Sequence, residues 1–93
     1  MLEYMFLELG FGFRVALKEI FAIMPLDIYG VKQLYLDYLR QERLYRATKG
    51  RKGRSLILLN NGTAFVSSLT TDELNKKVRE EKWIKRGLEE SGT

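Results

Sequence analysis

The chain contains neither cysteine nor histidine, and these two absences disfavour several classes of function. Without cysteine there can be no disulfide, and without either residue the usual ligands of a structural zinc site are missing. A catalytic nucleophile would have only lysine or a carboxylate to serve as its base. We therefore expect a protein that is not an enzyme and that has no catalytic residues, cofactor, metal or small-molecule substrate.

Long apolar runs are also missing. Residues 11–28 are rich in apolar side chains, but charged residues interrupt the segment, so no run reaches the roughly 18 apolar residues of a membrane span. Glu3 and Glu8 interrupt the apolar core that a signal peptide would need. These features predict a soluble protein of the cytoplasm that enters no membrane.

The length of 93 residues and the apolar content of 45% predict one folded domain. A domain of this size buries only about 60–65% of the surface of its unfolded chain, so its core is thin. Small domains without a disulfide or metal often gain stability by self-association. We place the domain at residues 1–86 and expect residues 87–93 to form a flexible tail.

Positive charge is concentrated in one part of the chain. The net charge of the whole chain is +4, but residues 40–54 alone carry +6 and the remainder carries −2. A concentrated patch attracts a polyanion more strongly than the same charge spread over the surface. The bases of this segment are Arg40, Arg43, Arg46, Lys49, Arg51, Lys52 and Arg54, and the one acid is Glu42.

Short apolar segments separated by turn residues predict a mainly antiparallel sheet. Gly10, Phe11 and Gly12 form one expected turn, and Pro25 should end the third strand. The Asn-Gly pair at 61–62 predicts a type I′ hairpin, because both central residues of that turn need positive φ. The expected strands are 4–9, 13–17, 20–24, 44–48, 55–59 and 63–67.

Two helices complete the predicted α+β fold. Apolar residues recur at helical spacing from Val31 to Leu39, which predicts a helix at about 28–42 with Asp27 as its N-cap. Thr70 and Glu73 have the spacing of a capping box and predict a second helix over about 71–86.

The segment between strands 44–48 and 55–59 gives the strongest functional signal, and we interpret it as a basic hairpin. Gly50 and Gly53 would let its backbone approach a phosphate closely. Arginine offers forked donors that match phosphate oxygens, and lysine offers a point charge. The alternative is that the segment is only a solvated loop on a basic protein. The candidate phosphate contacts are Arg51, Lys52 and Arg54, with Lys49 and Arg46 beside them.

These residues resemble the RemA family, small bacterial regulators of extracellular-matrix (biofilm) genes. The register runs without gaps from about Met5 to about Val78. The most specific part is Ala-Thr-x-Gly-Arg-Arg-x-Arg, which matches residues 47–54, and the Leu-Gly-Phe-Gly turn at 9–12 supports it. The resemblance implies a DNA-binding activator without a helix-turn-helix that assembles into a ring of identical subunits and presents basic patches to double-stranded DNA, associated with the nucleoid.

The same resemblance assigns DNA contacts to Arg51, Lys52 and Arg54. The family has a further DNA-contacting arginine at the position of Glu19, where the charge is reversed here, and Lys18 is the candidate to replace it. Two other departures are Lys49 in place of the family's tyrosine and Gly30 in place of a proline, and the second bears on subunit packing and ring size.

Two other classes of function remain open from the residues. An RNA-binding module could use the same basic patch, with exposed tyrosines stacking on bases. An oligomeric scaffold could use the patch to bind an acidic protein. Competition between duplex DNA and single-stranded RNA distinguishes the first, and binding of heparin without a DNA footprint distinguishes the second.

Overall fold

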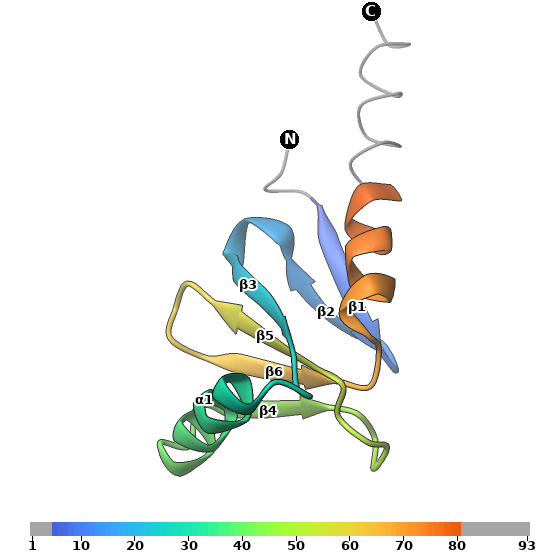
Figure 1. Cartoon of the computed structure of the whole chain (residues 1–93). Coiled ribbons are helices and arrows are strands. Elements are labelled where there is room, and N and C mark those ends of the chain that lie inside the picture. The colour runs from blue at the N-terminus through green and yellow to red at the C-terminus, as the bar shows by residue number, and fades with distance from the viewer. Residues whose placement is uncertain (1–4, 81–93) are drawn as a thin grey trace, which may run out of the picture.

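The computed structural model describes residues 5–80, which form six strands in two sheets and two helices (Figure 1). The α+β fold is as predicted. Each of the six strands and α1 begins and ends within two residues of its expected place, and a short 3-10 turn at Leu17–Glu19 was not predicted. The elements are β1 (Phe6–Gly10), β2 (Phe13–Ala16), β3 (Ile20–Pro25), α1 (Tyr29–Arg40), β4 (Leu44–Ala47), β5 (Ser55–Leu59), β6 (Ala64–Ser67) and a C-terminal helix that begins at residue 71.

The two helices begin in different ways. The capping box of the C-terminal helix is confirmed, since the Thr70 hydroxyl accepts from the Glu73 amide at 3.1 Å and the Glu73 carboxylate accepts from the Thr70 amide at 3.4 Å. The prediction that Asp27 caps α1 is wrong. The helix begins at Tyr29, one residue later than predicted, so Ile28 occupies the N-cap position and no side chain caps the helix. The predicted continuation to residue 86 and the tail at 87–93 lie outside the described residues.

The four-stranded sheet has the order β3-β5-β6-β4, and this order corrects the predicted basic hairpin. β5 pairs antiparallel with both β3 and β6, but β4 pairs parallel with β6. Because β6 lies between β4 and β5, the 48–54 segment is a crossover between strands that are not neighbours. Glycine spacing predicted the turn, but it carries no information about which strands become paired.

Turn geometry also departs from expectation. At Asn60 to Gly62 only Gly62 has positive φ, and Leu59 bonds Thr63 across a three-residue connection, so the predicted type I′ hairpin is wrong. The two-residue turn Phe11-Gly12, in contrast, has positive φ at both positions and joins β1 to β2. Lys49 and Gly50 form a turn of the same kind at the start of the 48–54 segment.

The core has two parts because both faces of the four-stranded sheet are covered. All five residues of β5 are buried. Leu56 and Leu58 belong to the cluster under α1, and Ile57 and Leu59 belong to the cluster under β1, β2 and Leu74 of the C-terminal helix. The central strand therefore contributes to two thin layers, which agrees with the small core expected for this length.

Two buried serines connect these layers at one end of the sheet. Ser55 and Ser67 are directly opposite each other on β5 and β6 and are fully buried. The Ser67 hydroxyl donates to the Leu9 carbonyl at 2.6 Å and accepts from the Leu69 amide at 3.0 Å. The Ser55 hydroxyl donates to the Leu69 carbonyl at 2.6 Å. The end of β1 and the start of the C-terminal helix are thus held to the larger sheet.

Replacing Ser67 by alanine is expected to lower the free energy of unfolding by about 1–3 kcal/mol, because it leaves a buried carbonyl and amide without partners. For a domain of this size, each kcal/mol corresponds to a fall in Tm of about 4–8 °C. Thermal unfolding at fixed protein concentration measures the change, with Ser68→Ala as control at the half-buried neighbour. Equal losses in the two variants would contradict the assigned role of Ser67.

Candidate nucleic-acid interface

The basic loop, defined as residues 48–54, has a main chain fixed by hydrogen bonds and cationic side chains that are exposed. Its turn is closed by the bond from the Arg51 amide to the Thr48 carbonyl at 3.0 Å. At its end, the Arg54 amide donates to Ser67 at 2.8 Å and the Arg54 carbonyl accepts from Leu26 at 3.0 Å. These bonds fix the main chain, while the side chains that point into solvent are Lys49, Arg51, Lys52 and Arg54.

The two glycines of the basic loop have different physical roles. Gly50 has φ +82° with open space around it, so it serves the turn. Gly53 has no positive φ. A Cβ there would lie 2.5 Å from Cγ1 of Val66 and 3.3 Å from a methyl of Leu26. Gly53 is therefore explained by close packing of the loop on the sheet, and only Gly50 lies where the backbone is open to a ligand.

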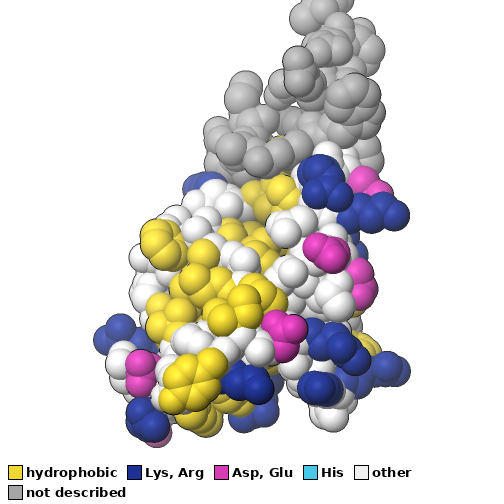
Figure 2. All heavy atoms as spheres, viewed as in Figure 1, with side chains coloured by type: hydrophobic (Ala, Val, Ile, Leu, Met, Phe, Trp, Pro, Cys, Tyr) yellow, Lys and Arg dark blue, Asp and Glu magenta, His cyan; other side chains and the backbone are white. Residues whose placement is uncertain are grey.

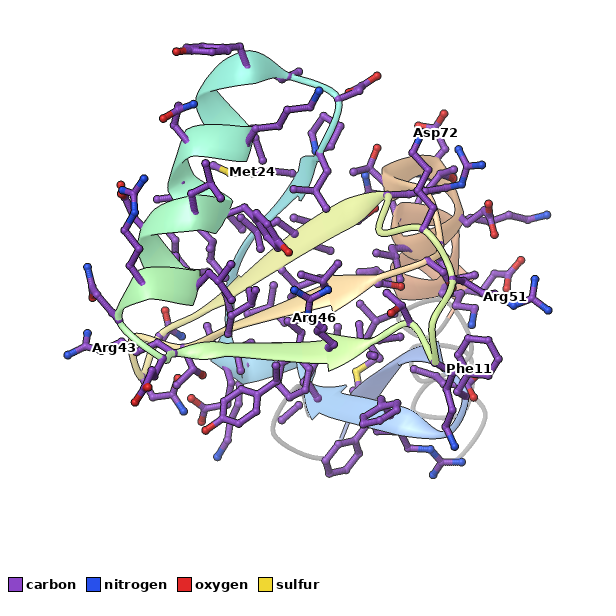
Figure 3. All side chains as sticks on the ribbon, turned by 90° about the horizontal axis from the view of Figure 1, so that it is seen from below. Phe11, Met24, Arg43, Arg46, Arg51 and Asp72 are labelled. Carbon is purple, nitrogen blue, oxygen red and sulfur yellow. The ribbon has the colours of Figure 1, made fainter. Side chains whose placement is uncertain are left out.

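The turn between β1 and β2 lies against the basic loop. The Arg51 guanidinium is 5.6 Å from the centre of the Phe11 ring, a cation–π geometry (Figure 3). Phe11 is 45% exposed although it is a large apolar side chain. From the sequence, no contact with a ligand or with Arg51 was expected of Phe11, which was predicted only to lie in the turn of residues 10–12. The available signal was an aromatic residue at the tip of a tight turn, where burial does not explain it.

The two other residues predicted to contact DNA, Arg46 and Lys18, lie in different places relative to the basic loop. Arg46, on β4, donates to the Tyr35 hydroxyl of α1 at 3.0 Å, so it lies on the α1 side of the basic loop (Figure 3). Lys18 lies in a 3-10 turn whose carbonyl accepts from the Asn60 side chain at 3.0 Å. Asn60 follows the far end of β5, so within one chain Lys18 does not join the basic loop.

Within residues 5–80, no side chain of the basic loop forms an ion pair. Within residues 5–80, the ion pairs are Arg40–Asp37 and Lys77–Glu8, and neither involves the loop. Both pairs are exposed and contribute little to stability. The positive charge of the loop is therefore available to an anion.

The basic loop stands between two hollows. One, of about 580 Å³, lies toward α1 and includes Arg46 and Lys32 in its lining. The other, of about 500 Å³, lies toward the β1–β2 turn and includes Phe11 in its lining. Three side chains line both hollows: Arg51, Lys52 and Arg54. The loop is thus a positively charged ridge with access from both sides.

The described part of the chain has neither a candidate membrane span nor a candidate metal site. Among residues 5–80, no helix is both long and apolar enough to cross a membrane. In the same residues, no group of three or more carboxylates, the only metal-ligand type present, is arranged to hold a metal ion. The basic loop and its flanks are the chemically distinctive surface.

Comparison with known proteins gives a consistent result. The profile of the RemA-like family, described as extracellular matrix regulatory protein A-like, matches residues 6–78. A protein of Leptospira biflexa is 34% identical over 86 residues, which cover 91% of this chain and 92% of the relative. One from Desulfatibacillum aliphaticivorans is 32% identical over 71 residues, covering 76% of this chain and 80% of the relative. Both are named "Putative regulatory protein".

Proposed function

The chain belongs to the RemA-like family, and we propose that it is a DNA-binding transcriptional regulator of the RemA type. Its regulatory role agrees with the names of its relatives. In this proposal the protein acts without catalysis, binds double-stranded DNA in the nucleoid and controls extracellular-matrix (biofilm) genes, as the resemblance implies.

The observation that carries the proposal is the rigid basic loop. Its backbone bonds at Thr48, Ser67 and Leu26 are independent of any ligand, so little ordering entropy is lost when a phosphate binds. Charge-assisted bonds from arginine to phosphate are short and strong. With contacts of this kind, the affinity for DNA depends on the phosphate backbone and on how easily the duplex bends, more than on the base edges.

Self-association supplies the repetition that a single loop lacks. Hydrophobic side chains gather on the face that carries β3, and lysines and arginines lie around the edge of this face, some of them at the end that carries the basic loop (Figure 2). β3 is an edge strand, and Phe21 on it is 71% exposed, while Tyr29 at the start of α1 is 77% exposed. Exposed apolar surface beside an open edge is typical of a protein–protein contact.

Closure into a ring needs two different surfaces, because each subunit contacts its two neighbours through opposite sides. β3 and β4 are the two edges of the four-stranded sheet. The β4 edge also exposes a large apolar side chain, since Tyr45 on β4 is 53% exposed. These edges support a head-to-tail assembly in which every subunit adds one basic loop to the DNA contact. Such multivalency raises avidity without new contact types.

Removing a loop charge tests the site. Arg51→Ala and Lys52→Ala are each expected to weaken binding to a labelled duplex by about tenfold at low salt, since each deletes a charge-assisted contact. Fluorescence anisotropy measures the affinity, on duplexes of several sequences, and the loss should be similar for all. The matched control is Arg40→Ala, which removes an exposed charge at the end of α1, away from the loop. Wild-type affinity in both loop variants would exclude the loop from DNA binding.

Phe11→Leu tests whether the aromatic ring positions Arg51. The change keeps an apolar side chain at the same backbone position and removes the cation–π contact, so DNA affinity should fall about two- to fivefold. In an Arg51→Ala background the same change should have no effect, because the guanidinium it holds is gone. An undiminished loss in that background would mean that Phe11 acts independently of Arg51.

Salt dependence tests the assembly. Each neutralised phosphate contributes about −0.9 to the slope of log K against log salt, so three contacts from one subunit give about −2.7. We expect a steeper slope, together with a particle larger than one chain in light scattering. A slope that three contacts explain would contradict the multivalent assembly. Tighter binding to single-stranded RNA of equal length, or to heparin with no DNA footprint, would support the alternative functions instead.

A further inference from the structure

We infer that the hollow between α1 and the basic loop, called here the α1 groove, binds a nucleotide: a small molecule with a phosphate group and an aromatic base. Its volume of about 580 Å³ lies within the roughly 300–1,000 Å³ of small-molecule sites. The α1 groove is separate from the Phe11 side of the loop, and Phe11 does not line it.

Charge defines one half of the ligand. A single carboxylate, Asp27, stands among the lining side chains against five cations, which gives the α1 groove a charge of +4. A polyphosphate group complements such a charge better than a monoanion does. The five cations are Lys32, Arg46, Arg51, Lys52 and Arg54.

The apolar lining defines the other half. Leu26, Leu36 and Val66 contribute side chains to the α1 groove, and Tyr35 lies beside them with its hydroxyl bonded to Arg46. The sugar-phosphate backbone of a duplex and a simple sugar phosphate offer only the C–H groups of the sugar to bury against these residues, which is much less apolar surface than a base offers. A nucleotide combines a flat base for the apolar lining with phosphates for the cations.

Asp27 completes the match. The sequence predicted that its carboxylate caps α1, but the structure shows no side-chain cap at this helix. Asp27 is instead an exposed residue in the lining of the α1 groove, and a carboxylate can accept hydrogen bonds from ribose hydroxyls or an exocyclic amine. The opposite chemistries of Asp27 and the cations fit the two ends of one nucleotide.

Nucleotide and DNA are expected to compete. Arg51, Lys52 and Arg54 line the α1 groove and are the DNA contacts of the proposed function, so one anion excludes the other from the same side chains. Such coupling is reciprocal, and each ligand lowers the affinity for the other by the same factor. The competition rests on the proposed function, whereas nucleotide binding by itself does not.

Calorimetric titration of the full chain without DNA tests the binding. ADP and GDP are the probes, and pyrophosphate and adenosine each carry one half of the nucleotide. ADP and GDP are each expected to bind with one molecule per chain, and more tightly than pyrophosphate or adenosine does. Lys32→Ala should weaken ADP binding about tenfold, and Leu36→Ala roughly fivefold. The matched control is Leu39→Ala, an exposed leucine of α1 outside the groove lining, which should bind as wild type.

Several results would overturn the inference: no binding of either nucleotide, pyrophosphate binding as tightly as ADP, or equal behaviour of Leu36→Ala and Leu39→Ala. Adding ADP to the labelled duplex complex should release DNA, and Leu36→Ala should need more ADP for the same release. ADP binding that leaves DNA affinity unchanged would refute the shared cations. A chain that binds ADP but no DNA would refute the proposed function and leave the nucleotide site standing.

Discussion

The opposed pair Ser55 and Ser67 is the constraint on which the functional surface depends. The Ser55 hydroxyl donates to the Leu69 carbonyl, and the Ser67 hydroxyl accepts from the Leu69 amide and donates to the Leu9 carbonyl. Leu9 lies two residues before the Phe11-Gly12 turn, and Leu69 lies two residues before the C-terminal helix. Since the backbone of Ser67 also accepts from Arg54, a single buried site sets the distance between the Phe11 turn, the helix and the basic loop. A thin two-layer core alone would not fix these three segments relative to one another.

The parallel pairing of β4 and β6 determines how the basic loop is presented. A hairpin would have folded the cations back along a paired neighbour, but a crossover carries them past the end of β6 and leaves both sides open. The crossover must pass close to the sheet, and Gly53 permits this because any side chain there would collide with Val66. The resulting ridge has a main chain fixed by hydrogen bonds and cation side chains exposed to solvent, so the cations can reach an anion on either side.

Local signals in the sequence predicted the elements, and tertiary contacts decided the rest. Short apolar segments bounded by turn residues located the strands, and the spacing of Thr70 and Glu73 located a helix start, because both signals depend on neighbours in the chain. The pairing of β4 with β6 depends on competition among strands, which no local pattern encodes. For the same reason the charge cluster at 40–54 looked continuous in the sequence. In the fold, Arg43 and Arg51 lie at opposite ends of β4 (Figure 3), and Lys18 is near Asn60 instead of the basic loop.

The two hollows beside the ridge differ in the residues that line them, so they suit different anions. On the Phe11 side, the apolar residues of the lining are Phe11 and Leu69, and the cations are the three that both hollows share. On the α1 side the same cations stand over leucine and valine, and Lys32 and Arg46 add charge that the other flank lacks. Because the loop backbone is fixed, only side-chain rotation can redirect Arg51, Lys52 and Arg54 from one flank to the other. A guanidinium that binds an anion in one hollow cannot bind an anion in the other. Binding in the two hollows is therefore coupled through the side-chain rotamers, and the coupling requires no movement of the fold.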